Sequence, residues 1–473
     1  MTDNVKDAGE STTIEVFPAK RFFVDSLTRD IDLADAILDL LDNCVDGVRR
    51  LGPQPGHRYD NYKAEIEFND QSFSITDNCG GISKHDAINS AFRFGRPNEY
   101  AQKSDGTIGV IGIGMKRAIL KMGRAAVVHS HHSESSFEVK ISPQWLDDDK
   151  DWRLHSEDVS SDLPAFGTRI VVTELNESVS HEFLSELFKN KLLEKVTAAF
   201  SLLTARGFGV SINGQAIKGQ IPSLLWQEEA PSGATAIRPF IYREIIDDVE
   251  VYLAVGFREA DKESQDETKR YYSSAPAGWT VACNDRVVLY CDKSEQTGWG
   301  TGRVPEYHTQ FIRISGFAEF RSSDTTKLPF TTTKHGINQQ NRVFLKVFDQ
   351  MREGTKLFTD WTNLFSEYTT QREEVFSTAN ARSTSVEDIK QKTKAPQPPL
   401  PGTGIGKPSP IREKPNLPRP KTERKEKTIS FKRPEAEIRT VSQFLNGHSD
   451  ERPSKVGECC FDMILNDAKD AEK

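Results

Sequence analysis

The chain has 473 residues, 36% of them hydrophobic and 28% charged, which is enough apolar material for the cores of two to four soluble domains. No apolar run approaches the roughly 18 residues of a membrane span, and the six cysteines are scattered without a CxxC pair, so we expect no membrane domain, disulfide framework or zinc site. The net charge of −8 hides an asymmetry, because residues 390–433 contain thirteen Lys/Arg and three Asp/Glu and are near +10, which leaves the remainder near −18.

After a short predicted strand at residues 12–17, the stretch 31–47 (IDLADAILDLLDNCVDG) has apolar residues at helical spacing and predicts a helix with one buried face. Four polar residues interrupt that face, namely Asp39, Asp42, Asn43 and Asp46. Asp39 and Asn43 are four residues apart and therefore lie on the same side of the helix. A bound cation would relieve repulsion between the carboxylates, and the Asn43 amide oxygen suits Mg²⁺. A solvated helix face is the alternative interpretation.

A β-hairpin is predicted next, because Ala64, Ile66 and Phe68 alternate with charged residues before an Asn-Asp turn and a second alternating strand. The second strand leads into DNCGGI, residues 77–82. An acidic residue at a strand end, followed by paired glycines, can place a carboxylate at the rim of a pocket with backbone close to a ligand. The same pattern is often only a turn.

A polar stretch from Phe94 to Asp105 ends in a glycine-rich segment, in which Gly109, Gly112 and Gly114 precede a predicted helix from Met115 to Lys121. Glycine-rich loops at helix N-termini bind phosphate through free N–H groups and the helix dipole. This segment lacks the GK[ST] ending of a Walker A loop and does not open a first βαβ unit. A last short motif, FGTR at residues 166–169, enters an apolar strand.

These four pieces, in this order and spacing, resemble the four motifs of the gyrase, heat-shock chaperone, histidine kinase and MutL (GHKL) ATPase superfamily. The helix is similar to the motif E-L-x-x-N-x-x-D-A, and residues 77–81 to the D-x-G-x-G motif. The glycines after residue 108 resemble the phosphate loop at the end of the mobile lid, and Gly167-Thr168 the closing GT step. The resemblance covers residues 10 to 175 and implies an α+β fold with a Bergerat-type α/β sandwich that binds ATP and Mg²⁺.

The resemblance assigns roles to positions of this chain. Asn43 would hold Mg²⁺ at the triphosphate, and Asp77 would accept a hydrogen bond from the adenine amino group, with Thr168 beside it. The remaining nucleotide-binding residues would be Asp46, Gly81, Gly109, Gly112, Gly114, Met115 and Lys116. The general base of the family is a glutamate, whereas this chain has Asp39, which is one methylene shorter. A base must reach its proton, so the resemblance implies ATP binding and a slow ATPase.

Residues 179–340 predict a second domain. A long amphipathic helix at residues 181–203 is followed by a hairpin at 210–215, strands at 237–242 and 249–255, a hairpin at 279–289 and a strand at 311–320. This arrangement resembles the S5-like transducer domain of the MutL, gyrase B, MORC and ninety-kilodalton heat-shock families, in which a basic residue reaches the γ-phosphate. Lys334, in TTTKHG, is the first candidate and Lys327 the second, and a solvated turn is the alternative for both.

Two other interpretations are rejected. A sensor histidine kinase carries its phosphoacceptor histidine on a helix before the ATPase domain, whereas no histidine precedes His57 here. The group His129, His131 and His132 has no carboxylates at useful spacing for a metal site, and a surface turn at or just beyond a strand end is the better interpretation.

The C-terminal part is predicted in three pieces. Residues 341–372 should form one or two closing helices, and residues 373–427 a disordered linker rich in proline and lysine. Residues 428–473 predict a small module with a strand at 428–431 and helices at 435–446 and 454–467, the second capped by Ser454. It resembles half of a ribbon–helix–helix unit, and a tail that docks on a partner or on the body of the protein is the alternative.

The sequence therefore predicts an ATPase domain at residues 10–178, followed by the transducer, closing helices, linker and module. Among the GHKL proteins it is most similar to the MORC and MutL branches, which implies a conformational clamp. ATP would close a lid between Phe94 and Gly109 and bring two protomers together as a homodimer. The expected client is DNA; the alternatives are a chaperone-like protein client, other protein partners bound by the tail, or a nucleotide switch that does not hydrolyse ATP. Scattered cysteines and the absence of a membrane span favour the cytoplasm, or the nucleus in a eukaryote.

Overall fold

The computed structural model divides the chain into two compact units, one up to Pro420 and one from Lys421 onward. None of its described helices is both long and apolar enough to cross a membrane. The predicted strand at 12–17 lies outside the described residues. The structure describes residues 19–52, 55–95, 107–109, 112–160, 162–163, 165–228, 234–259, 277–331, 333–395, 409–421 and 429–471.

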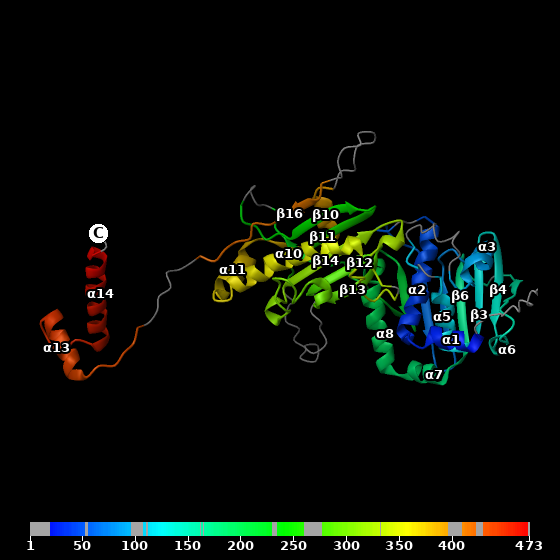
Figure 1. The fold of residues 1–473 in the computed structure, drawn as a ribbon, viewed down its shortest axis with the longest axis horizontal. Helices are drawn as coiled ribbons and strands as arrows, with labels where there is room; N and C mark the ends of the chain where they lie inside the picture. The colour runs from blue at the N-terminus through cyan, green and yellow to red at the C-terminus, as the bar shows by residue number, and fades with distance from the viewer. Residues whose placement is uncertain are drawn as a thin grey trace, which may run out of the picture. The chain divides into compact units, whose positions relative to one another are not determined.

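An eight-stranded sheet forms the base of the first domain, in the order β5-β4-β3-β6-β2-β1-β7-β8 (Figure 1). The predicted hairpin is confirmed, because β1 and β2 pair antiparallel with Ile66 opposite Ile75. The strands are β1 Lys63–Phe68, β2 Phe73–Asp77, β3 Gly123–His132, β4 Ser135–Ile141, β5 Ser156–Asp158, β6 Gly167–Leu175, β7 Gly209–Ile212 and β8 Gln215–Ala216.

Helices cover this sheet, and their apolar faces share one core with it. The predicted first helix is confirmed as α2 (Leu33–Arg50), which begins where the Asp32 side chain accepts a hydrogen bond from the Ala34 N–H. The phosphate-loop helix is α5 (Gly114–Met122). The other described helices of this region are α1 Lys20–Thr28, α3 Lys84–Asp86, the π-helix η1 Ala87–Ala91, α6 Pro143–Asp147, α7 Glu177–Leu184, α8 Glu186–Ala199 and α9 Ser201–Ala205.

Two predictions about residues 179–216 are wrong. The single helix expected at 181–203 is three helices, α7, α8 and α9, and the first break lies at Ser185, whose hydroxyl caps α8 by accepting from the Phe188 N–H at 3.4 Å. The hairpin expected in the second domain is β7–β8, which joins the first sheet because β7 pairs parallel to β1. The first domain therefore extends to about Ala216 rather than 178, since local alternation cannot reveal which sheet a strand joins.

The second domain is built on a six-stranded sheet in the order β13-β12-β14-β11-β10-β16, with the long helix α10 (Arg342–Leu364) packed on β11 (Figure 1). The predicted hairpin is confirmed: β12 and β13 are joined by Asn284 and Asp285, which have φ of 47° and 69°. The strands are β9 Ser223–Trp226, β10 Phe240–Ile246, β11 Val249–Phe257, β12 Gly278–Cys283, β13 Arg286–Asp292 and β14 Ile314–Arg321, with 3-10 turns η3 Glu295–Thr297, η4 Thr309–Phe311 and η5 Thr325–Lys327.

The predicted disordered linker at 373–427 is wrong for its described part. Residues 373–395 and 409–421 contain the end of α11 (Thr369–Thr378), β15 (Arg382–Ser385), α12 (Val386–Lys392) and β16 (Ile411–Glu413). β15 pairs with β9, and β16 extends the second sheet at β10. A few apolar anchors such as Ile389 and Leu417 are buried, although proline and lysine dominate the local composition. Tertiary pairing, which composition does not reveal, orders this segment.

The C-terminal unit contains α13 (Glu435–Asn446) and α14 (Pro453–Ala471), so both predicted helices are confirmed. The Ser442 hydroxyl donates to the His448 carbonyl oxygen at 2.7 Å and fixes the turn between them. The predicted strand is wrong for its described residues 429–431, which have no ladder partner in this unit, and Thr428 lies outside the description. Ser454 is not the helix cap, because α14 already begins at Pro453.

Candidate functional site

A cavity of about 680 Å³ lies among α2, the end of β2, the start of α5 and the segment that follows β14. Its volume is in the range of small-ligand sites. Twelve of the residues that the sequence assigned to the site lie in its lining: Asp39, Asn43, Asp46, Asp77, Gly81, Gly109, Gly112, Gly114, Met115, Lys116, Thr168 and Lys334. These positions are spread from Asp39 to Lys334 along the sequence, so the fold rather than local chain proximity brings them together.

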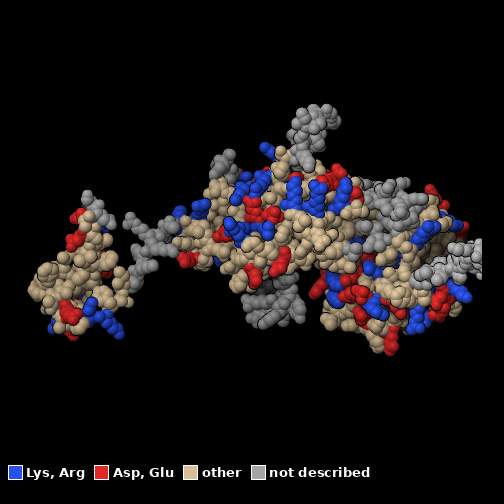
Figure 2. All heavy atoms as spheres, viewed as in Figure 1, with Lys and Arg blue, Asp and Glu red and all other residues tan. Residues whose placement is uncertain are grey.

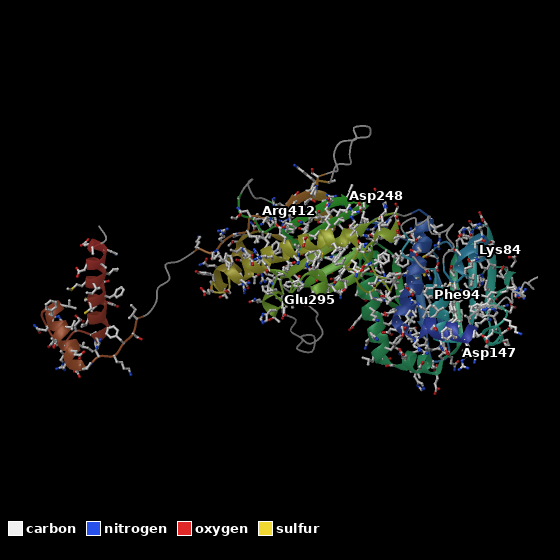
Figure 3. The ribbon with its side chains drawn as sticks, viewed as in Figure 1. Lys84, Phe94, Asp147, Asp248, Glu295 and Arg412 are labelled. Atoms are coloured by element: carbon white, nitrogen blue, oxygen red, sulfur yellow. The ribbon has the colours of Figure 1, made fainter. Side chains whose placement is uncertain are left out.

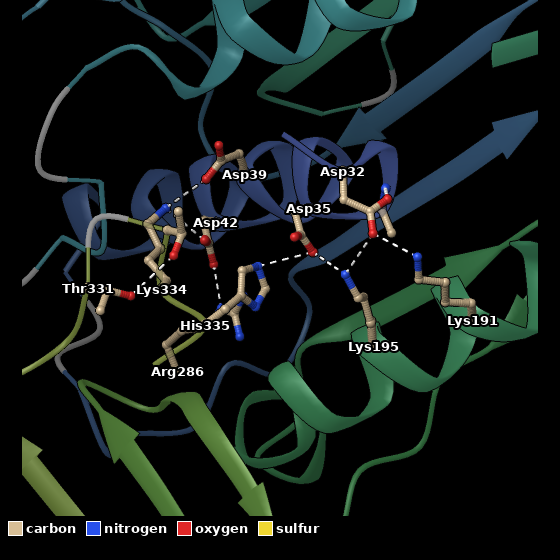
Figure 4. Close-up of polar contacts among 12 residues, drawn as sticks. Asp32, Asp35, Asp39, Asp42, Lys191, Lys195, Arg286, Thr331, Lys334 and His335 are labelled. Atoms are coloured by element: carbon tan, nitrogen blue, oxygen red, sulfur yellow. Dashed lines mark hydrogen bonds and ion pairs between the residues drawn. The ribbon is translucent and has the colours of Figure 1, made fainter. Parts of the chain in front are cut away.

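Two carboxylates of α2, Asp39 and Asp42, form ion pairs with lysine and arginine side chains. From the sequence alone, a bound metal cation is the expected partner. Asp42 accepts from Arg286 Nε at 2.9 Å and from Lys334 Nζ at 2.8 Å (Figure 4). Burial acts to raise the pKa of the Asp42 carboxyl, but Arg286 and Lys334 outweigh it, so the pKa lies below its usual value. Asp39 is bound by Lys334 Nζ at 3.2 Å and by Arg117 at 2.5 Å.

Lys334 reaches the cavity from a tight turn of the second domain. Its backbone N–H donates to the Thr331 carbonyl oxygen at 2.8 Å, and its φ is 60°, a left-handed conformation that is costly for a lysine. Burial acts to lower the pKa of the Lys334 ammonium, but Asp42 and Asp39 outweigh it, so its pKa is raised and the side chain stays charged. Its neighbour His335 binds Asp35 Oδ1 at 3.2 Å, a second contact between this turn and α2 (Figure 4).

Lys327, the other lysine considered from the sequence, does not line the cavity. Its amino group binds Asp248 at 2.9 Å, and Asp248 lies at the turn between β10 and β11 on the surface (Figure 3). The structure therefore separates the two candidates, with Lys334 at the cavity and Lys327 outside it.

At the other end of the cavity, Asp77 terminates β2. Its Oδ1 accepts from the Cys79 N–H at 2.7 Å and from the Thr168 N–H at 3.3 Å. Burial raises the pKa of the Asp77 carboxyl, and these hydrogen bonds oppose the rise. A Cβ on Gly167 would lie 1.9 Å from the Asp77 carbonyl oxygen, so only glycine lets the two strands approach this closely. This close approach places Thr168 beside Asp77, as the GT step predicted.

Hydrogen bonds from the backbone of the glycine-rich segment to Asp46 connect this segment to α2. Its carboxylate accepts from the Ile108 N–H at 2.5 Å and from the Gly109 N–H at 2.8 Å. A Cβ on Gly114, the first residue of α5, would lie 3.3 Å from the Asp39 carboxyl carbon, so the start of α5 lies next to this carboxylate of α2. Among the described residues no side chain caps α5, and the N-terminus of a helix carries the partial positive charge that suits an anion.

Two predicted residues, Lys116 and Asn43, line the cavity with different surroundings. Lys116 lines the cavity, but its amino group binds the Ala91 carbonyl oxygen at 2.8 Å and that of Gly112 at 2.5 Å, so it supports the loop backbone in this arrangement. Asn43 also lines the cavity, and no hydrogen bond to its amide is found among the described residues. Most of the predicted lid between Phe94 and Gly109, including residues 96–106, lies outside the described residues.

The histidine group lies at the end of β3, as the sequence indicated, but the three histidines belong to the strand, which ends at His132, rather than to a surface turn. His129 is buried and faces Glu138 and Asp162, each at 3.9 Å from Nδ1. Within the part of the chain that the structure describes, no cluster of three or more His, Cys, Asp or Glu side chains could hold a metal ion by itself. A site for Mg²⁺ in this cavity would need ligand oxygens from a bound phosphate, as is usual for this ion.

Three residues of the site were missed from the sequence, namely Asp42 as an ion-pair partner, Arg117 and Arg286. Arg117 belongs to the basic pair that follows the glycine loop, and this position could have been noticed. Arg286 stands 244 residues from Asp42 and carries no local pattern that marks it.

Comparison with known protein families agrees with this geometry. Residues 31–166 match the family model of the histidine kinase-, DNA gyrase B- and HSP90-like ATPases. This part of the chain is a GHKL-type ATPase domain. Comparison with the curated proteins gives no match. The matched residues include α2, Asp77 and the glycine loop, whereas Thr168 and the whole second domain lie beyond them.

The GHKL domain binds ATP, and the cavity has the features that this ligand needs. Close backbone approach at Gly167 and Gly47 keeps the Asp77 end narrow: a Cβ on Gly47 would lie 2.5 Å from the Cys79 carbonyl oxygen. The opposite end offers the cations Lys334 and Arg117 and the N-terminus of α5, which suit phosphates. The residues present therefore fit a nucleotide with its base at Asp77 and its phosphates at α5.

Proposed function

We propose that this protein hydrolyses ATP with Mg²⁺ and works as a conformational clamp. The observation that carries the proposal is Lys334, which comes from the second domain and lies between the two carboxylates of α2. A buried, charged lysine in a left-handed conformation is costly, so its position is better explained by a role at the phosphates than by a solvated turn.

In this proposal Asp39 orients a water molecule and accepts its proton as the water oxygen bonds to the γ-phosphorus. The bond from the γ-phosphorus to the bridging oxygen breaks, and ADP leaves with that electron pair. Lys334 stabilises the charge that develops on the γ-phosphoryl oxygens. Asn43 would be the protein ligand of Mg²⁺, which supplies further charge neutralisation. Asp77 would accept from the adenine amino group, with Thr168 beside it.

The clamp part of the proposal rests on the same lysine. ATP that binds Lys334 favours one arrangement of the two domains, and its hydrolysis removes that preference. Closing of the lid between Phe94 and Gly109 and homodimerisation through the first domain would follow, as in the MORC and MutL branches that the sequence resembles. The second domain would then be a transducer.

DNA is the proposed client. Between residues 382 and 421, the described residues include eight Lys/Arg and three Asp/Glu. Figure 2 shows many Lys and Arg side chains, with acidic ones among them, on the part of the second domain that carries α10, β10 and β16. Such a surface can contact phosphates in a salt-dependent way. A chaperone-like protein client is the alternative, and so is a nucleotide switch without hydrolysis, which the short Asp39 side chain favours.

The test is steady-state ATPase activity with and without long double-stranded DNA, together with sizing in a non-hydrolysable ATP analogue. We expect slow Mg²⁺-dependent turnover, dimer formation with the analogue and stimulation by DNA that weakens as salt rises. Turnover and dimerisation without any DNA effect would favour a protein client. ATP binding without turnover would favour the switch.

A further inference from the structure

Arg117 has no role in the sequence motifs, and the family match assigns none to it. Arg117 lies in the first turn of α5, directly after the glycine loop, and lines the cavity. Its NH2 group donates to Asp39 Oδ2 at 2.5 Å, while Lys334 binds Asp39 Oδ1 at 3.2 Å. The proposed base is thus held by two cations from two different elements.

The position of Arg117 is unfavourable unless it meets an anion. A helix N-terminus carries partial positive charge, and the first turn of α5 has no acidic residue to balance the arginine. Asp39 is the carboxylate that the structure pairs with it. Arg117 Nε is buried, and no described residue accepts a hydrogen bond from it. The planar guanidinium has five N–H donors, so it can bind a second anion while it remains in this place.

The balance of charge around Asp39 also favours binding of an anion by Arg117. Asp39 and Asp42 contribute two negative charges, and the cations bound to them, Arg117, Lys334 and Arg286, contribute three positive charges. Asp46, which binds the Gly109 N–H, and Lys116, which binds the Gly112 carbonyl oxygen, add one charge of each sign, so this group of side chains beside the glycine loop carries one positive charge in excess. A phosphoryl group would restore the balance, and it would compete with Asp39 for the two cations that bind the carboxylate.

We infer that Arg117 is a second γ-phosphate ligand beside Lys334, and that Asp39 holds both cations until the γ-phosphate displaces it. This inference rests on the proposed function. Displacement leaves the Asp39 carboxylate free to bind water, so the base is released only when a triphosphate is in the site. ADP, which has no γ-phosphate, leaves the two ion pairs of Asp39 intact.

The test is equilibrium binding of ADP and of a non-hydrolysable ATP analogue to the full chain and its variants, with thermal unfolding as the check on folding. For Arg117→Gln we expect affinity for the ATP analogue to fall about ten- to a hundredfold, since a charge-assisted hydrogen bond is lost, and affinity for ADP to stay within about twofold. Asp39→Asn removes the competing carboxylate and should bind the analogue several-fold more tightly than the wild type. Arg124→Gln is the matched control, because Arg124 pairs with Asp147 on the surface and should change neither affinity.

Equal loss of ADP and analogue affinity in Arg117→Gln, or no loss of either, would overturn the inference while the ATPase proposal stands. If Arg117→Gln fails to fold, Arg117→Lys keeps the charge and is expected to lose analogue affinity selectively to a smaller extent; unchanged selectivity there also overturns it. A wild type that binds neither nucleotide would overturn the proposed function itself, and the inference with it.

Discussion

The amino group of Lys334 lies 2.8 Å from Oδ2 of Asp42, although 292 residues separate the two along the chain. Asp42 is also bound by Arg286 of β13, so two cationic side chains of the second domain form ion pairs with α2. The same helix carries Asp39, Asn43 and Asp46. Any movement of the second domain relative to α2 must therefore change the contacts of residues that line the nucleotide cavity, which is the physical link that a clamp requires.

Lys334→Ala should lower kcat for ATP hydrolysis by about a hundredfold or more, because it removes a cation from the phosphoryl group that is being transferred. Steady-state ATPase assays measure this loss, and analogue binding shows whether the site is still formed. Lys327→Ala is the matched control, since that lysine binds Asp248 on the surface and should retain wild-type turnover. Similar losses in the two variants would contradict a specific role for Lys334.

Asp39→Asn should reduce kcat by about 10²- to 10⁴-fold, the range expected for loss of a general base, while the nucleotide still binds. Single-turnover hydrolysis with saturating enzyme separates this loss from any change in affinity. Asp32→Asn serves as a control on the same helix, because Asp32 is the helix cap and faces Lys191 and Lys195 rather than the cavity. Retained turnover in Asp39→Asn would show that another group activates water.

Much of the first domain could be predicted from the sequence, because its determinants are local. The helical periodicity of α2, the hairpin before Asp77 and the order of the four motifs together indicated eleven of the residues that line the cavity, and the resemblance of the second domain to a transducer added Lys334. Contacts that depend on tertiary pairing could not be predicted. Arg286 reaches Asp42 only because the β12–β13 turn docks on α2, and β16 is ordered by an edge of the second sheet rather than by its own composition.

Asp77→Asn should weaken ATP binding about tenfold or more, because the single amide oxygen stays with the Cys79 and Thr168 N–H groups and a donor-only NH2 group replaces the carboxylate oxygen that would accept from the adenine amino group. Asparagine keeps one side-chain oxygen for the Cys79 and Thr168 N–H groups, so the fold should survive. Titration calorimetry with ATP and GTP would show the loss as reduced discrimination between the two bases. Asp70→Asn, in the exposed β1–β2 turn, should bind like the wild type.

Glu319 predicts how stability depends on pH. Burial acts to raise the pKa of this carboxyl, but Arg321, Lys390 and Arg206 outweigh it and lower the pKa to about 2 from its usual value of 4.5. Because the pKa is lower in the folded state, the charged carboxylate stabilises the fold above about pH 4.5, and this contribution declines as pH falls toward 2. Urea unfolding of the wild type should therefore show a free energy that falls steadily below pH 4.5.

Glu319→Gln tests this assignment. At pH 7 it should lower the free energy of unfolding by about 3 kcal/mol, because Lys390 loses its carboxylate and Arg206 and Arg321 keep only their other partners, among them Asp285. The decline of stability below pH 4.5 should also become shallower than in the wild type. Glu194→Gln, on the exposed side of α8, should change neither quantity. An unchanged pH slope in Glu319→Gln would assign the acid sensitivity to other carboxylates.

Removal of the C-terminal unit should leave the nucleotide site intact. The chain up to Pro420 forms one compact unit, and its last described anchors, Leu417 and the Pro418 carbonyl oxygen that accepts from Trp361 Nε1 at 2.7 Å, would be retained. We expect a chain that ends at Pro420 to bind ATP with wild-type affinity and to unfold at the same temperature. A chain that ends at Thr393 also loses β16 and these anchors, and should unfold at a lower temperature because Trp361 and the β10 edge become exposed. Equal thermal stability of the two truncated chains would show that residues 409–420 do not contribute to the second domain.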